Sequence, residues 1–299
     1  MWEKIIAFFM SIFTFFASLF GAGGTPTKQD NYIWNVSYGA EERQIVDIAF
    51  PENAKGEIGA ILMLHGGEWT SGDKNFYTNS VKYGATMGYV SAAMNYRYVS
   101  DKISAADIMD DITLALNCIK SKAAERGITV NKLLITGVSS GAHLALLYAY
   151  SKKNISPVEI TSVVSFCAPT DLADTRIIQS FLFENNLGDT SYMVGLISNV
   201  CGYKITEENY TGEEAQKALK SISPVYFVDK NTVPTVIGHG TTDLIVPYVN
   251  ATVLDAALAL NGVKHDFITS VFGHTTLISD KTFMDKADAL VLEYAKAYL

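Results

Sequence analysis

The chain alternates short apolar runs with longer stretches whose apolar residues recur at helical spacing. Residues 44–50 alternate as a half-buried strand does, whereas residues 58–64 form the continuous apolar run typical of a central strand. This alternation predicts an α/β fold with a mostly parallel central sheet and helices on both faces. Further strands are predicted over residues 89–95, 132–136, 161–166, 233–238 and 264–271, and helices over residues 75–87, 103–126, 141–150, 248–261 and 280–298.

One stretch breaks this rhythm. Residues 171–228 contain amphipathic pieces and scattered glycines but no strand pattern. A structureless loop of that length is uncommon inside a compact domain. We therefore expect a small helical cap inserted into a single catalytic domain that spans residues 25–299.

The first 24 residues have a different character. Thirteen of the sixteen residues at positions 5–20 are apolar, they follow Lys4, and the small residues 21–24 come after them. This is the order of a secretory signal peptide. The run is short for a membrane span, which needs about 20 apolar residues. We expect an exported protein, either secreted or held by an uncleaved anchor, with an anchor as the second reading and a buried helix as the third.

Composition narrows the function further. Twenty-three basic and thirty-one acidic residues give a net charge of −8, which disfavours binding to nucleic acids or to anionic membranes. The three cysteines, Cys118, Cys167 and Cys201, cannot all pair within one chain and lack the spacing of metal ligands. Cys167 ends an apolar run, where a thiol usually acts as a small hydrophobe. We expect no metal and no organic cofactor.

The most informative window is Gly-x-Ser-x-Gly at residues 137–141, placed between a predicted strand and a predicted helix. A serine on such a sharp turn takes a strained backbone, and the flanking glycines let neighbouring elements approach closely. The pattern predicts Ser139 as a nucleophile. The N-terminus of the helix that follows Ser139 directs the amide of Ser140 toward a developing oxyanion.

A second glycine window follows the apolar run at residues 58–64. His65 is followed by Gly66, Gly67, Glu68 and Trp69. Adjacent glycines allow backbone N–H groups to face a ligand oxygen without obstruction by Cβ. Gly66 and Gly67 are therefore the expected remaining oxyanion donors, and His65 is expected to hold the loop by hydrogen bonding.

A nucleophilic serine needs a histidine base and an acid that orients it. Asp243 and His274 lie after the last two predicted strands, at the sheet edge where ligands bind in open parallel sheets. The order Ser139, Asp243, His274 is the order of the nucleophile-elbow enzymes. Asp171, which follows the preceding strand, is a competing acid.

The other histidines fit other roles. His143 lies one turn into the helix after Ser139 and is expected to brace the turn. His239 is expected to order the loop that carries Asp243. His265 falls inside a strand pattern and is expected to be exposed.

At this point the chain resembles the α/β-hydrolase esterases of the His-Gly-Gly-x-Trp type, a group similar to carboxylesterases, feruloyl and acetyl-xylan esterases and kynurenine formamidase. The resemblance runs from about residue 38 to the C-terminus. It implies the α/β-hydrolase fold, a small-molecule ester as substrate, the triad and oxyanion donors named above, and substrate binding by Glu68 and Trp69. It rests on HGGEW at 65–69, SGDK at 71–74, NYR at 95–97, GVSSGAHL at 137–144, SP at 223–224 and HGxxDxxVP at 239–247.

The sequence also departs from the family pattern. Glu68 stands where the hormone-sensitive-lipase-like branch has a third glycine, Ser140 replaces a frequent alanine, and Ala142 replaces a glycine. The cap matches nothing transferable, so substrate choice stays open. An amidase, arylformamidase or serine peptidase with the same triad is the alternative, and a non-catalytic hydrolase-like binding module is a further one.

Overall fold

The computed structural model describes residues 31–174 and 190–299 of the chain. The expected export segment, residues 1–24, lies outside these ranges, as does part of the expected cap. In the part of the chain described by the structure, none of the helices combines the length and apolar character needed to cross a membrane.

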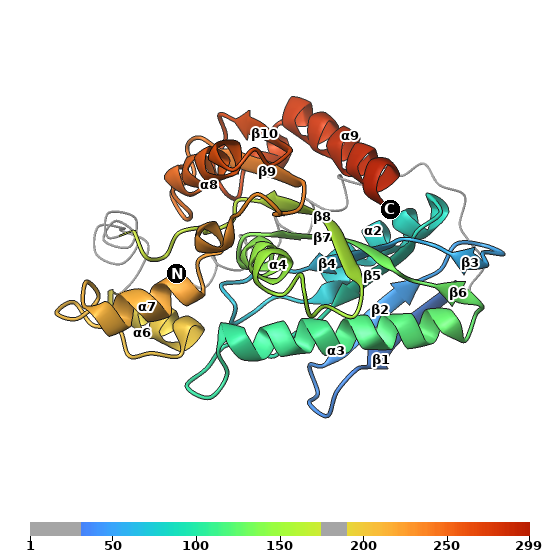
Figure 1. The fold of residues 1–299 in the computed structure, drawn as a ribbon, viewed down its shortest axis with the longest axis horizontal. Helices are drawn as coiled ribbons and strands as arrows, with labels where there is room; N and C mark the ends of the chain where they lie inside the picture. Colours follow the sequence, from blue (N-terminus) through green and yellow to red (C-terminus); the bar gives the residue numbers. More distant parts are fainter. Residues whose placement is uncertain (1–30, 175–189) are drawn as a thin grey trace.

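An eight-stranded sheet forms the centre of the molecule (Figure 1). Its strand order is β1-β2-β5-β4-β7-β8-β9-β10. The first two pairings are antiparallel and the others are parallel. This confirms the predicted mostly parallel sheet. The strands are β1 (Tyr32–Ser37), β2 (Ile45–Ala49), β4 (Ala60–Leu64), β5 (Val90–Met94), β7 (Lys132–Val138), β8 (Glu159–Phe166), β9 (Thr235–Gly240) and β10 (His265–Ser270).

Helices cover both faces of the sheet, as predicted. The core on one face includes residues of α3, α4 and α8, and the core on the other includes residues of α2 and α9. Successive residues of β4 point to opposite cores: Leu62 enters the first and Met63 the second. A strand buried on both faces has no polar side, which explains its continuous apolar run. The helices are α2 (Thr78–Thr86), α3 (Ala105–Ala124), α4 (Ser140–Ser151), α8 (Val249–Leu260) and α9 (Lys281–Tyr298), with 3₁₀ turns at Lys74–Tyr77, Pro224–Phe227 and Leu277–Ser279.

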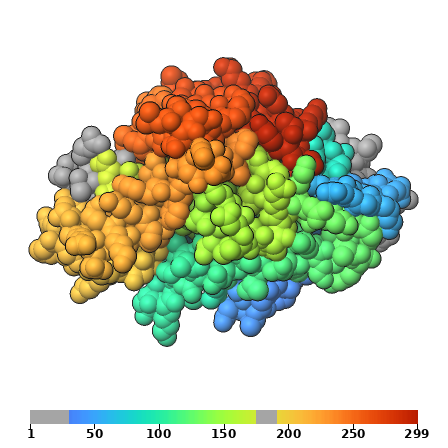
Figure 2. Space-filling model, viewed as in Figure 1, coloured from blue at the N-terminus to red at the C-terminus, as the bar shows by residue number. Residues whose placement is uncertain are grey.

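Two helices, α6 (Thr190–Cys201) and α7 (Glu213–Ser221), lie in the stretch that interrupts the β–α rhythm. They pack against one another, and α6 also contacts α3. In Figure 2 the residues coloured yellow to orange gather in a lobe at one end of the molecule.

Three strands of the structure are not predicted by the sequence pattern. The edge strand β1 has an irregular register with β2 between Ile33 and Val36, where Asn35 adopts a φ of 55°. Such a bulge interrupts the strict alternation by which a strand is recognised. The strands β3 (Gly56–Glu57) and β6 (Ile128–Thr129) pair only with each other and are too short to show any period.

Candidate active site

Ser139 occupies a strained turn between β7 and α4. Its φ of 55° and ψ of −125° lie in a region that residues with a Cβ rarely adopt. The backbone N–H of Ser139 donates to the carbonyl of Phe166 (2.8 Å), and its carbonyl accepts from His143 N–H (3.0 Å). The turn is therefore fixed from both sides, and Ser140 begins the helix that follows.

The two glycines around Ser139 are needed for close packing. A Cβ on Gly137 would lie 2.5 Å from the carbonyl carbon of Gly141, and a Cβ on Gly141 would lie 2.2 Å from the carbonyl oxygen of Leu64. Gly66 is similarly close, because a Cβ placed there would come within 3.3 Å of the Ser139 Cβ. The structure thus brings the glycine loop after β4 beside the serine turn.

The parallel register aligns the ends of three neighbouring strands. Val138 pairs with Phe166, and Phe166 pairs with Gly238. The residues that follow, Ser139, Cys167 and His239, therefore emerge side by side at the carboxyl edge of the sheet. This is the edge at which open parallel sheets bind ligands.

Asp243 and His274 meet at the same edge. The Nδ1 atom of His274 donates to Oδ2 of Asp243 at 2.6 Å, the short separation of a charge-assisted hydrogen bond. The other carboxylate oxygen of Asp243, Oδ1, accepts the backbone N–H groups of Ile245 and Val246, both at 2.9 Å. The acid is thereby held rigidly in its loop, and it fixes the imidazole of His274.

A second histidine approaches the same carboxylate. His239 Nε2 lies 3.2 Å from Asp243 Oδ2 and donates to the carbonyl of Val246 at 2.9 Å. Burial alone would raise the pKa of Asp243, but the attraction of His274 and the hydrogen bonds from both histidines outweigh it and lower that pKa. Asp243 therefore stays ionised at neutral pH although it is buried.

Cys167 is a member of this group that the sequence reading treated only as a small hydrophobe. Its Sγ, a carboxylate oxygen of Asp243 and a ring nitrogen of His274 all lie within 4.8 Å of one another. Burial, followed by the neighbouring charge of Asp243, raises the pKa of the Cys167 thiol well above its usual value. The thiol is therefore neutral at physiological pH. The signal that could have found it is the strand register, because Cys167 immediately follows β8.

The same three residues are the one group in the described ranges that could hold a metal ion. Two metal–ligand bonds of about 2 Å each would separate the ligand atoms by about 3 Å or more. The 2.6 Å separation of His274 Nδ1 and Asp243 Oδ2 instead fits a shared proton.

Hydrogen bonds to two backbone carbonyls fix the glycine loop, the segment of residues 65–72 after β4. His65 Nδ1 donates to the carbonyl of Gly66 (2.8 Å). The carbonyl of Gly67 accepts Ser71 Oγ (2.8 Å) and the backbone N–H of Ser71 (2.9 Å). This confirms the expectation that His65 holds the loop by hydrogen bonding. Burial lowers the pKa of His65 to about 4, so its ring is neutral at pH 7.

Glu68 and Trp69, the expected substrate-binding residues, point in different directions. Trp69 is 2% exposed, and its Nε1 donates to Nδ1 of His143 at 3.0 Å. Its side chain therefore supports the loop from within the core. Glu68 is partly exposed, and its Oε2 accepts the hydroxyl of Tyr192 from α6 at 3.1 Å. Glu68 thus joins α6 to the glycine loop.

His143 is packed as the sequence predicts. Its Nε2 donates to the carbonyl of Ile222 at 2.6 Å, and burial lowers its pKa to about 4. Asp171, the competing acid, accepts the N–H groups of Ala173 and Asp174 with Oδ1 and so closes its own turn. His265 begins β10, is partly exposed, and lies 3.1 Å from Asp255.

Four of the six non-glycine residues with a positive φ in the described ranges lie at this site: Glu68, Trp69, Ser139 and Cys167. Backbone strain of this kind persists only where the surroundings fix it, and it concentrates at active sites. With the buried acid–histidine pair, it identifies this edge of the sheet as the candidate active site.

Comparison with known proteins shows the family to which the chain belongs. A family model described as BD-FAE matches residues 46–258, more than half of the chain. The probable carboxylic ester hydrolase LipM of Mycobacterium tuberculosis is 25% identical over 66% of this chain and 44% of its own length. Kynurenine formamidase of Drosophila melanogaster is 26% identical over 54% of this chain and 53% of its own.

Among solved structures, esterase B from Lactobacillus rhamnosis superposes with a TM-score of 0.71 at 19% identity, over 99% of this chain and 92% of that one. This likeness shows the α/β-hydrolase fold. The chain spans between 6% and 60% of the length of six curated relatives.

Proposed function

Because the chain belongs to the BD-FAE family of α/β-hydrolases, we propose that it hydrolyses carboxylic esters through an acyl-enzyme formed on Ser139. The observation that carries the proposal is the 2.6 Å hydrogen bond between His274 and an ionised Asp243, at the sheet edge where Ser139 occupies its strained turn. No metal or organic cofactor takes part in this reaction.

The proposed first step is attack by Ser139 Oγ on the ester carbonyl carbon. The proton of Ser139 passes to Nε2 of His274, while Asp243 stabilises the imidazolium that forms. The negative charge goes to the carbonyl oxygen, which the amides of Gly66, Gly67 and Ser140 receive as hydrogen-bond donors. Collapse of this intermediate expels the alcohol, which takes the proton from His274.

In the second step water attacks the acyl-enzyme. His274 accepts a proton from the water, and the tetrahedral intermediate again places its charge among the three amides. Its collapse releases the carboxylic acid and returns the proton to Ser139. The groups proposed for both steps follow the carboxyl ends of β4, β7, β9 and β10.

Glu68 supplies the proposed contact with the rest of the substrate. Its carboxylate lies next to the glycine loop, and the Tyr192 hydroxyl bond leaves oxygen lone pairs that can accept a substrate hydroxyl. We therefore favour esters whose alcohol part carries hydroxyl groups, such as acetylated sugars, over anionic esters. Glu68→Gln should raise KM for an acetylated sugar more than for p-nitrophenyl acetate.

The proposal is tested by hydrolysis of p-nitrophenyl acetate and butyrate. Ser139→Ala should lower kcat by at least about 10⁴-fold, since the nucleophile is lost, whereas Ser221→Ala, on an exposed serine of α7, should leave it unchanged. Faster turnover of an arylformamide than of any ester would replace ester hydrolysis by the amidase alternative. Full ester hydrolysis by Ser139→Ala would refute the proposal.

We also propose that residues 5–20 direct export of the protein. The support is the sequence alone, with its apolar run between Lys4 and the small residues 21–24. Expression of the full chain, followed by N-terminal sequencing of the protein recovered outside the cytoplasm, tests this. A new N-terminus near residue 25 is expected, and a protein that stays in the cytoplasm with residue 1 intact would contradict it.

A further inference from the structure

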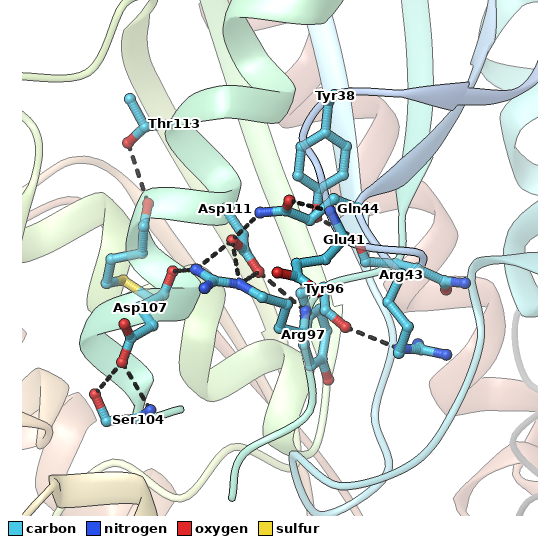
Figure 3. A network of polar contacts seen from close by, with 12 residues as sticks. Tyr38, Glu41, Arg43, Gln44, Tyr96, Arg97, Ser104, Asp107, Asp111 and Thr113 are labelled. Atoms are coloured by element: carbon cyan, nitrogen blue, oxygen red, sulfur yellow. Dashed lines mark hydrogen bonds and ion pairs between the residues drawn. The ribbon is translucent and has the colours of Figure 1, made fainter. Parts of the chain in front are cut away.

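Arg43, in the connection between β1 and β2, reaches the glycine loop after β4. The guanidinium of Arg43 donates from Nε to the carbonyl of Tyr96 (2.9 Å) and from Nη2 to the carbonyl of Gly72 (3.2 Å). It also lies 3.7 Å from the centre of the Tyr98 ring. Figure 3 shows Arg43 extending toward Tyr96. Arg43 is therefore held in one conformation, and partly shielded from water.

The neighbouring residue anchors the backbone of Arg43. Gln44 Nε2 donates to Oδ1 of Asp111 on α3 (2.8 Å), and the same carboxylate forms a salt bridge with Arg97 (2.7 Å). Figure 3 shows this group of polar side chains between the β1–β2 connection and α3. The backbone that carries Arg43 is thus anchored to α3 through Gln44.

The third hydrogen-bond partner of Arg43 is His65. Its Nη2 lies 3.3 Å from His65 Nε2. A guanidinium has only donors, so Nε2 of His65 must be the acceptor and its proton must reside on Nδ1. That is the proton which His65 Nδ1 donates to the carbonyl of Gly66 at 2.8 Å. Arg43 therefore selects the tautomer that can hold the Gly66 carbonyl.

The direction of one carbonyl decides the direction of one amide. In a planar trans peptide the C=O and the N–H point to opposite sides, and the described chain contains no cis peptide. The carbonyl of Gly66 and the N–H of Gly67 belong to the same peptide unit. Holding the Gly66 carbonyl toward His65 therefore aims the Gly67 N–H the opposite way.

The preceding peptide unit is fixed by the same rule. The hydroxyl of Tyr96 donates to the carbonyl of His65 (2.7 Å), which sets the direction of the Gly66 N–H. The rings of His65 and Tyr96 stack at 4.2 Å, with 16° between their planes. Arg43 bonds to the backbone of Tyr96 and to the ring of His65, so it contacts both residues that orient the two amides.

Gly72 lies close to the hydrogen bond between His65 and the Gly66 carbonyl. A Cβ on Gly72 would lie 2.1 Å from the Gly66 carbonyl oxygen and 2.5 Å from His65 Nδ1. The Gly72 backbone therefore packs directly against this hydrogen bond. Its own carbonyl is held by Arg43 and by the Tyr98 hydroxyl (2.7 Å).

We propose that Arg43 is a positioning residue for ester hydrolysis, which fixes the Nδ1-protonated tautomer of His65 and thereby aims the Gly67 amide at the oxyanion. The inference rests on the proposed function. Arg43 touches no reacting atom, so it acts through His65 and the Gly66–Gly67 peptide. Preorganised donors stabilise a transition state more than a ground state, so the effect falls on kcat.

Arg43→Met tests the inference, because methionine keeps an unbranched apolar stem over Tyr98 and removes the guanidinium. We expect kcat for p-nitrophenyl acetate to fall about 10- to 100-fold with KM changed less than about threefold, since a misaimed donor costs less than the 10²- to 10³-fold of a lost one. The matched control is Arg126→Met. Arg126 also lies over an aromatic ring, 4.4 Å from the centre of Phe50, at the end of α3, and its substitution should leave kcat unchanged.

A second measurement observes the ring of His65 in the unaltered enzyme. ¹⁵N NMR of the unaltered enzyme, with the His65 signals assigned by their loss in His65→Asn, should show a neutral ring protonated on Nδ1 at pH 7. A ring protonated on Nε2, or on both nitrogens, would overturn the inference. Unchanged kcat in a folded Arg43→Met would overturn it as well. The proposed function would survive either result, because ester hydrolysis by Ser139→Ala tests it separately.

Discussion

His274 Nδ1 and Asp243 Oδ2 lie 2.6 Å apart, and the remaining oxygen of Asp243 is held by two backbone amides. This pairing fixes the proton of His274 on Nδ1 and leaves Nε2 as the basic nitrogen. A loop after β9 and a loop after β10 are thereby joined into one chemical unit. The loops are neighbours because the parallel register places Ser270 of β10 beside Gly240 of β9.

Asp243→Asn should lower kcat by about 10³- to 10⁴-fold with little change in KM. An asparagine amide can donate to Nδ1 and so stabilise the tautomer that carries its proton on Nε2, which cannot accept the serine proton. Steady-state kinetics on p-nitrophenyl acetate measure this effect. Asp101→Asn, on an exposed residue, is the control. Activity within tenfold of the original enzyme would exclude Asp243 as the orienting acid.

His239 should contribute less to kcat than His274 does, but by a measurable amount. Its Nε2 lies 3.2 Å from Asp243 and donates to Val246, so it steadies the acid and its loop together. His239→Leu should lower kcat about tenfold, while His239→Gln, whose amide nitrogen can replace Nε2, should retain most of it. Equal losses in the two variants, at equal melting temperatures, would show that the hydrogen bond is not the reason.

Much of this arrangement is encoded locally and was therefore predictable. The central strands are buried on both faces and read as unbroken apolar runs, while the glycines at 137 and 141 mark a turn that only small residues allow. The roles expected of His65 and His143 follow from their place one residue or one turn away from these motifs. Each of these signals depends on a few neighbouring residues.

The parts that sequence reading missed depend on long-range geometry. Cys167 joins the site only because β8 ends level with β7 and β9, which an apolar run cannot reveal. The direction of the Trp69 side chain could not be predicted either: Glu68 and Trp69 both have a positive φ, and Trp69 is buried. The bulge at Asn35 interrupts the alternation of β1, so the pattern does not predict this edge strand.

The serine turn should be intolerant of added volume. Gly141→Ala would place a Cβ 2.2 Å from the backbone oxygen of Leu64, so the strand or the helix must shift. We expect a loss of about 3 kcal/mol in the free energy of unfolding, the upper range for overpacking. Gly195→Ala is the matched control, since nothing lies within 4 Å of the added atom in α6. Denaturant titration of both variants measures the difference, and equal stability would contradict the packing described.

The contribution of Asp288 to stability should fall as the pH rises from about 4 to about 7. Burial, and then the charge of Asp285, raise the pKa of Asp288 on α9 to about 7, against about 4 in the unfolded chain. Its Oδ1 has no hydrogen-bond partner among the described residues. At Asp288 the folded state binds more protons than the unfolded state in this window, so the contribution of this residue is full below pH 4 and is lost through pH 7. The buried His65 and His143, whose pKa values are lowered to about 4, act in the opposite direction between about pH 4 and pH 6.5.

Asp288→Asn lacks this contribution, so its melting temperature relative to the original enzyme should increase as the pH rises, and it should melt at a higher temperature at pH 8. The exposed Glu293→Gln on the same helix should leave the slope as it is. Melting temperatures recorded between pH 4.5 and pH 8 provide the comparison. Melting temperatures of Asp288→Asn that run parallel to those of the original enzyme across this range would contradict the raised pKa of Asp288.

The most direct measurement is covalent labelling of the folded enzyme with a fluorophosphonate, followed by peptide mass spectrometry. A serine activated by the His274–Asp243 pair reacts with such a probe at its Oγ. We predict one phosphonylated residue, Ser139, with labelling abolished in Ser139→Ala and strongly slowed in His274→Ala. Attachment to any other serine, or undiminished labelling of Ser139→Ala, would contradict the assignment of Ser139 as the nucleophile.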